Sequence, residues 1–82
     1  MLEDINEQID VLVAFTRKTV VPLSFTWGTK KFSIKKVNIK YSRRIGQTLH
    51  HIYAVSSINA YFKINFNTEN NKWMLEEVYY GT

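Results

Sequence analysis

The residues best suited to chemistry in this chain are cations spaced along one extended stretch. They are Lys31, Lys35, Lys36, Lys40, Arg43 and Arg44. Residues two apart on a β-strand share a face and lie about 6.6–7 Å apart, close to two axial rises of a nucleic-acid strand. The spacing predicts a ridge that binds phosphates without reading sequence. Two alternatives stay open: lysines that guard a strand against edge-to-edge association, and a surface for an acidic protein.

The charge distribution supports a basic binding face. The seven acids lie near the two ends of the chain, and no carboxylate occurs between Asp10 and Glu69. Nearly all the lysines and arginines fall in that interval, and the formal net charge is +4. A long basic interval of this kind favours an anionic partner, with DNA and RNA equally open.

Aromatic residues are the second group with binding chemistry. The chain holds two Trp, five Tyr and five Phe. Aromatic rings can stack on unpaired bases, although most of these rings follow the inward phase of a strand and are expected in the core. Trp27, Tyr61 and Tyr79 are the candidates for exposed stacking positions, because each stands at a turn or beside a residue of opposite phase.

Residue patterns for catalysis or metal binding are missing from the sequence. There are no cysteines, and the adjacent His50 and His51 face opposite sides of a strand, so they cannot converge on one metal ion. The three glycines are too far apart for a phosphate-cradling loop. Glu76 and Glu77 are strand neighbours rather than a facing acid and base. We therefore expect a non-enzymatic binding domain with no catalytic residue, metal or cofactor.

Period-two alternation runs through most of the chain and predicts an all-β fold. We expect about six antiparallel strands, of which the longest runs from Lys31 to Tyr41. Its apolar phase slips between Ile34 and Val37, which predicts a β-bulge near Lys35-Lys36. That bulge would keep Ile39 and Tyr41 inward and the lysines outward. A second slip precedes Val78. The expected architecture is a strongly bent meander, a half-open SH3-like barrel.

The chain is expected to hold one domain. Residues 1–9 carry Leu2, Ile5 and Ile9 between acids, which predicts either a short N-terminal helix or a frayed acidic tail. Residues 10–82 are expected to form the β-domain. The acidic start does not resemble a signal peptide, and no apolar run approaches the roughly 20 residues of a membrane span. With no cysteine for disulfides, a cytoplasmic location away from membranes is the expectation.

Several segments together resemble a family of small uncharacterised bacterial domains. The resemblance covers roughly residues 11 to 80 and rests on Pro22, Phe25-x-Trp27, Phe32, Val37, Tyr53-x-Val55, Phe62-x-Ile64-x-Phe66 and Trp73-x-Leu75-x-x-Val78-Tyr79. Members are often encoded near error-prone DNA polymerases and repair genes, so the resemblance implies a nucleic-acid-related or polymerase-accessory role. The chain departs from the family pattern at Tyr41, since it has no Trp in the middle segment near Arg43 and Arg44.

Two further hypotheses belong to a different functional class. The first is a protein–protein adaptor whose edge strand or aromatic patch docks on a larger assembly. The second is a homodimer formed through an edge strand. Neither needs the cations to share one face.

Overall fold

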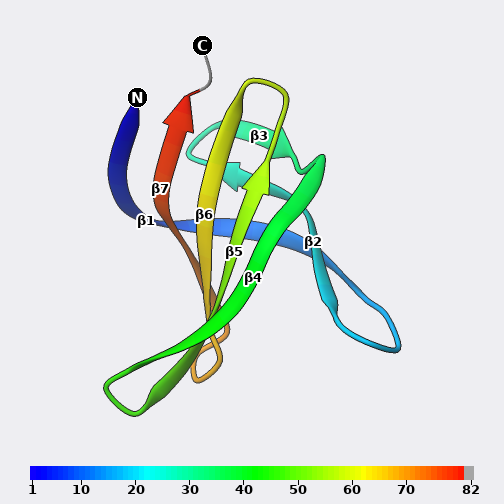
Figure 1. The fold of residues 1–82 in the computed structure, drawn as a ribbon, viewed down its shortest axis with the longest axis vertical. Coiled ribbons are helices and arrows are strands. Elements are labelled where there is room, and N and C mark those ends of the chain that lie inside the picture. The colour runs from blue at the N-terminus through cyan, green and yellow to red at the C-terminus, as the bar shows by residue number, and fades with distance from the viewer. Residues whose placement is uncertain (81–82) are drawn as a thin grey trace.

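The computed structural model describes residues 1–80, which form seven strands and no helix (Figure 1). The strands are β1 (Leu2–Phe15), β2 (Val20–Trp27), β3 (Lys30–Ser33), β4 (Lys36–Ile45), β5 (Thr48–Ser56), β6 (Ala60–Asn67) and β7 (Lys72–Tyr80). The predicted all-β class is confirmed. Gly81 and Thr82, which the predicted domain includes, lie outside the described residues. No helix able to span a bilayer occurs in the described part of the chain.

The strands form one sheet in the order β3-β2-β1-β7-β6-β5-β4, and every neighbouring pair is antiparallel. Hairpins join β1 to β3 in one run and β4 to β7 in another. The first and last strands, β1 and β7, pair with each other. As a result β3 and β4, which follow one another in the chain, are the two opposite edges of the sheet.

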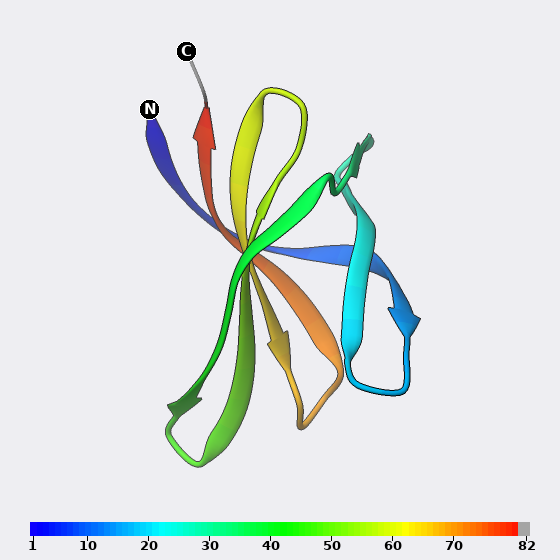
Figure 2. The same cartoon turned by 45° about the vertical axis from the view of Figure 1, so that its right-hand side comes forward.

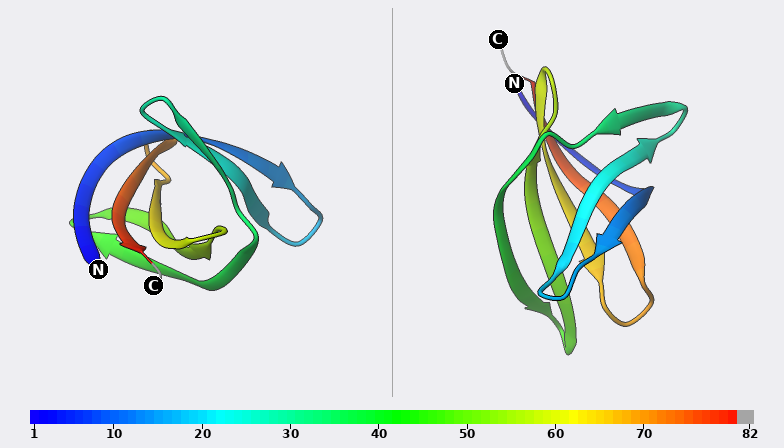
Figure 3. Two further views of the ribbon diagram at one scale, coloured as in Figure 1. Left: turned by 90° about the horizontal axis from the view of Figure 1, so that it is seen from above. Right: turned by 90° about the vertical axis from the view of Figure 1, so that its right-hand side faces the viewer.

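A two-residue connector, Ile34-Lys35, links these edges and forces the sheet to roll. The edges of a flat seven-stranded sheet would lie about 29 Å apart, whereas the chain from Ser33 to Lys36 spans at most about 11 Å. The Ile34 amide donates to the Leu23 carbonyl at 2.9 Å and the Lys35 amide to the Ser56 carbonyl at 2.8 Å. The sheet curls round on itself (Figure 3), but β3 and β4 do not pair, so it is not closed.

Two sequence-based expectations about strand limits are wrong. The predicted strand from Lys31 to Tyr41 is two strands, because the chain leaves one edge of the sheet at Ile34 and enters the other at Lys36. Residues 2–9 are neither a helix nor a frayed tail, since they pair with β7. The register with β7 shifts between Asp4 and Glu7, where Asn6 has a φ of 56°. This shift breaks the two-residue alternation between Ile5 and Ile9, so the spacing of the apolar residues resembles that of an amphipathic helix.

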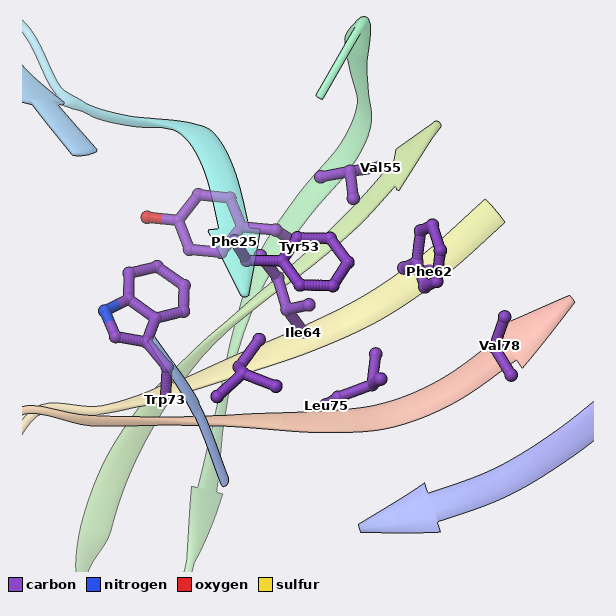
Figure 4. Close-up of a cluster of buried hydrophobic side chains, with 9 residues drawn as sticks. Phe25, Tyr53, Val55, Phe62, Ile64, Trp73, Leu75 and Val78 are labelled. Carbon is purple, nitrogen blue, oxygen red and sulfur yellow. The ribbon is translucent and has the colours of Figure 1, made fainter. Parts of the chain in front are cut away.

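The core lies on one face of the rolled sheet, here called the inner face. Its buried residues are Ile9, Phe25, Tyr53, Val55, Phe62, Ile64, Trp73, Leu75 and Val78. Phe25 packs edge-on against Phe62 with ring centroids 4.9 Å apart (Figure 4). The ring of Phe32 in β3 lies 5.0 Å from that of Phe62, so the two ends of the sheet share one core. The opposite side of the sheet is the outer face.

The β-bulge in β4 falls at Asn38 rather than near Lys35-Lys36. Val37 pairs with Val55, but Ile39 pairs with Ala54 and Lys40 with Tyr53. The extra residue reverses the phase of the strand. Ile39 is consequently 58% exposed on the outer face, and Tyr41 is exposed there too, against the expectation that both point inward. The predicted slip before Val78 is present, with Glu76 as the extra residue of β7 opposite β6.

Replacing Leu75 with alanine tests this assignment of the inner face. Leu75 is fully buried, whereas Leu12 is mostly exposed. We expect Leu75→Ala to lower the free energy of unfolding by about 2–5 kcal/mol and Leu12→Ala by no more than about 0.5 kcal/mol. Urea unfolding followed by circular dichroism measures both, and similar losses in the two variants would contradict the assignment.

Candidate functional site

The strand register divides the predicted cations between the two faces of the sheet. Lys36 pairs with Ser56 and Arg43 with His50 on the outer face. Lys40 pairs with Tyr53, and Arg44 with Leu49, on the inner face. The predicted single ridge is therefore wrong, because the bulge at Asn38 reverses the side-chain phase between Lys36 and Lys40.

Of the remaining two cations, Lys31 lies at the other edge of the sheet and Lys35 lies between the two edges. Lys31 pairs with Thr26 on the outer face of β3, and Lys35 belongs to the connector. Both line an open hollow of about 380 Å³, together with Ile58 and Tyr80. The structure brings Lys31 and Lys35 together in this hollow, and Lys35 directly precedes Lys36 of β4.

Two cations of the outer face form ion pairs with glutamates. Arg43 Nη2 lies 3.0 Å from Glu76 Oε2, and Lys63 Nζ lies 3.5 Å from Glu77 Oε2. Glu76 also accepts a hydrogen bond from Asn65 Nδ2, and the Asn65 Oδ1 shares a hydrogen bond of 2.7 Å with His50 Nδ1. This network fixes Arg43 on the sheet and leaves it less positive charge to offer a phosphate.

The predicted stacking residues lie away from the β4 cations. Trp27 is half-buried and its Nε1 donates to Glu7 Oε1 at 3.1 Å. Tyr61 and Tyr79 are both exposed, as expected, and their ring centroids lie 6.3 Å apart on the outer face. The neighbouring row of the sheet pairs Glu77 with Asp4. The same row holds Lys63, which pairs with Glu77, so it places one net negative charge beside the two tyrosines.

A separate cleft of about 200 Å³ opens on the inner face. Residues of the β1–β2 hairpin form one wall and residues of β5, β6 and β7 the other; they are Val13, Phe15, Val20, His51, Tyr53, Phe66 and Trp73. The β1–β2, β4–β5 and β6–β7 turns all lie at one end of the molecule (Figure 2). We call this hollow the inner cleft.

Aromatic rings form a continuous series along the inner cleft. The Phe66 ring lies 4.8 Å from the ring of Trp73, which lies 5.5 Å from that of Tyr53. His51 is nearly parallel to Phe66 at 6.5 Å, and its Nδ1 shares a hydrogen bond of 2.8 Å with Ser42 Oγ. Phe15, at the end of β1, is largely exposed. The cleft thus offers flat apolar walls to a planar ligand.

The polar atoms of two core side chains open onto this cleft. Tyr53 is 2% exposed and Trp73 8% exposed. No buried side-chain nitrogen or oxygen among residues 1–80 lacks a hydrogen-bond partner, so the Tyr53 hydroxyl and the Trp73 Nε1 are accessible to solvent. Figure 4 shows both atoms on the side of the cluster remote from Val78. Burial raises the pKa of the Tyr53 hydroxyl, so it stays protonated and able to donate near neutral pH.

The rim of the inner cleft is cationic. Lys40 Nζ lies 5.5 Å from the centroid of the Tyr53 ring and donates to Thr19 Oγ1 at 2.7 Å, which joins β4 to the β1–β2 turn. That turn carries Arg17 and Lys18, and Arg44 continues the inner phase of β4. Within the part of the chain that the structure describes, none of these four cations forms an ion pair with a carboxylate.

Histidine and acidic side chains do not converge. His50 and His51 lie on opposite faces, as the alternation predicts, because they pair with Asn67 and Phe66. No group of three or more His, Asp or Glu side chains among residues 1–80 is placed to hold a metal ion.

Sequence reasoning included Lys40 and Arg44 but missed the cleft beside them. Its aromatic residues follow the inward phase, so they were indistinguishable from core residues. The signal that was available is the Thr16-Arg17-Lys18-Thr19 turn, in which the Thr16 hydroxyl donates to the Thr19 carbonyl at 3.0 Å and accepts from the Thr19 amide at 3.1 Å. The threonines order the backbone of this turn, and Arg17 and Lys18 are exposed on it.

Comparisons with known proteins found no matching family model, no matching curated protein and no matching solved structure. The resemblance to the bacterial domain family therefore stays a prediction.

The raised pKa of Tyr53 gives a pH test of its burial. Because the folded state holds the proton more tightly than the unfolded state, this contribution to stability is complete below the ordinary pKa of 10.0 and is lost as the pH rises above it. We expect the free energy of unfolding to fall more steeply above that pH in the native protein than in Tyr53→Phe. Parallel urea titrations on both sides of that pH measure the difference, and identical slopes would contradict the burial.

Proposed function

We propose that this domain is a non-enzymatic binding protein for single-stranded nucleic acid. An unpaired base enters the inner cleft, and Lys40, Arg44 and the cations of the β1–β2 turn contact the adjacent phosphates. The observation that carries this proposal is the combination of an aromatic cleft with nearby cations that no carboxylate among residues 1–80 neutralises.

The chemistry of the inner cleft suits a single strand better than a duplex. Sequence-tolerant binding of single strands combines aromatic rings, on which bases stack, with cations that follow the backbone. Phe66 and His51 supply ring surface on one wall and Phe15 on the other. A duplex keeps its bases stacked and paired, so it cannot place one between these walls without an unstacking cost of a few kcal/mol.

The outer face is less favourable for the same ligand. Its exposed tyrosines stand beside the Asp4–Glu77 row, and Arg43 and Lys63 are already paired with glutamates. Lys36 lies on this face without such a partner among residues 1–80 and therefore serves as a matched control for Lys40 on the same strand.

Salt-dependent binding of labelled single strands tests the proposal. With four phosphate contacts, log affinity should fall with log salt at a slope of about −3, and Lys40→Ala or Arg44→Ala should each reduce that slope by about 0.7. Lys36→Ala should leave affinity and slope unchanged. Fluorescence anisotropy at several salt concentrations measures all three variants.

Two outcomes of that titration would overturn the proposal. Absence of binding at low salt rejects nucleic-acid binding by this domain. An equal loss of affinity in Lys36→Ala and Lys40→Ala places the contact along both faces of β4 and rejects the inner cleft as the site.

The β4 edge favours a second candidate function, protein docking. This ten-residue strand has no partner on its free side, and Ile39, Tyr41 and Ile45 expose apolar side chains in one row on the outer face. A second copy that adds its own β4 edge-to-edge would continue the sheet and bury part of this row against the same row of the partner.

Sedimentation velocity tests the docking candidate. It predicts a dimer whose fraction grows with protein concentration and which Ile39→Lys converts to monomer, because the substitution places a charge in the covered row. Leu12→Lys, at an exposed position on the outer face of β1, should leave the dimer intact. A monomer at every concentration would exclude self-association through this edge.

A further inference from the structure

The free edge of β3 lines the open hollow of about 380 Å³ that the proposed function does not use. We call this hollow the edge hollow. Three successive residues of β3 and the connector residue Lys35 form one wall, and the β5–β6 turn with the end of β7 forms the other. The β2–β3 hairpin and the β5–β6 turn lie at the end of the molecule opposite the β1–β2 turn (Figure 2). The edge hollow is therefore separate from the inner cleft.

Backbone groups of β3 are directed toward the edge hollow. The Ile34 amide donates to the Leu23 carbonyl of β2, and successive residues of a strand direct their backbone groups to alternate sides. Lys31 and Ser33 therefore direct their amides and carbonyls away from β2, toward the side on which no strand pairs with β3. Two amides and two carbonyls in this arrangement are what an added strand requires.

The charge of the edge hollow favours an acidic strand. Lys31 and Lys35 line it, no carboxylate does, and neither lysine forms an ion pair among residues 1–80. Asp10 belongs to the same outer-face row as Thr26 and Lys31, but it stands two strands away from Lys31. An added strand would lie about 4.8 Å from β3 and about 14 Å from β1, beyond a Debye length of about 8 Å. Attraction to Lys31 therefore exceeds repulsion by Asp10.

Apolar side chains lie along the same edge. Phe32 is half-buried and packs against Phe62, Ile58 of the β5–β6 turn is 76% exposed, and Tyr80 is exposed at the end of β7. Side chains of a strand alternate between the two faces, so an added strand would place one set beside Lys31 and the residue between them beside Phe32. The edge hollow thus fits acidic residues on both sides of an apolar one.

We infer that β3 binds an extended acidic peptide, which adds a strand to the sheet in the edge hollow and alternates acidic with apolar side chains. A second copy of this chain is a poorer occupant, because pairing two copies of β3 brings their lysines together. Phosphodiester groups are also a poorer match, because they accept hydrogen bonds but donate none to the carbonyls of Lys31 and Ser33. This binding lies outside the proposed function, since it uses a different surface.

Titration with labelled peptides tests the inference. The probe has about seven residues, enough to span the four-residue β3, with glutamate on both sides of a central phenylalanine. We expect it to bind at low salt, and Lys31→Glu to weaken binding about fivefold, because an attractive cross-strand pair becomes repulsive. A peptide with lysine for each glutamate should instead bind Lys31→Glu more tightly than the native protein. Lys72→Glu makes the same charge change at the exposed start of β7 and should leave both affinities unchanged.

Alternate N-methylation of the peptide separates strand addition from attraction between charges alone. Only every second amide of an added strand faces β3, and a methyl group removes its donor. We expect methylation of one alternate set of amides to weaken binding at least about tenfold, and methylation of the other set to change it little. Hydrogen exchange at the Lys31 and Ser33 amides should slow when the peptide is bound.

Four outcomes would overturn the inference. Absence of peptide binding at low salt leaves the lysines of β3 only the role of protecting a free edge. Equal effects of the two methylated sets reject strand addition. Binding of oligo(dT) that Lys31→Glu weakens, with no binding of the peptide, assigns the edge hollow to nucleic acid. A dimer in sedimentation velocity that Lys31→Glu converts to monomer assigns it to a second copy of this chain.

Discussion

The short connector between β3 and β4 is the constraint on which the rest of the structure depends. It joins strands at opposite edges of a seven-stranded sheet, so the sheet must roll until those edges approach. Rolling places Phe32 of one edge against Phe62 near the other and creates a shared core. The hydrogen bonds of Ile34 to β2 and of Lys35 to β5 hold the two ends without pairing them. An unclosed sheet leaves an opening on its inner face, and the cleft lies where the core ends.

Single-residue register shifts determine the electrostatics of the two faces. The bulge at Asn38 sends Lys40 and Arg44 inward, while Lys36 and Arg43 stay outward. The extra residue in β7 is Glu76, which reaches Arg43 at 3.0 Å. Two local irregularities therefore neutralise cations on the outer face and leave others without carboxylate partners beside the aromatic cleft. Without the extra residue at Asn38, Lys40 and Arg44 would point outward and Arg43 inward, although the composition of the chain would be unchanged.

The sequence was sufficient to predict burial where it depends on local alternation. It was not sufficient where strand pairing between distant segments determines the secondary structure or the direction of a side chain. Phe62, Ile64 and Val55 alternate cleanly and are buried as expected. Residues 2–9 carry the same apolar content in a strand or a helix, and only pairing with β7 determines which one forms. Ile39 and Tyr41 are apolar but exposed, because they belong to an edge strand after a bulge, and neither property is visible in the residue types. For the candidate site, Lys40 and Arg44 could be identified from charge alone. The sequence did not predict that Lys40 and Arg44 are separated from the other cations, because strand order and the position of the bulge determine that separation. The other cations are Lys31, Lys35, Lys36 and Arg43.

Tyr53 and Trp73 connect the stability of the domain to its binding surface. Their rings belong to the core, so removing either ring would cost several kcal/mol of stability. Their polar atoms open onto the cleft, where solvent reaches them, because no buried side-chain nitrogen or oxygen among residues 1–80 lacks a partner. A ligand in the cleft therefore contacts side chains that also hold the core together. Such a ligand binds only the folded state and so stabilises the domain.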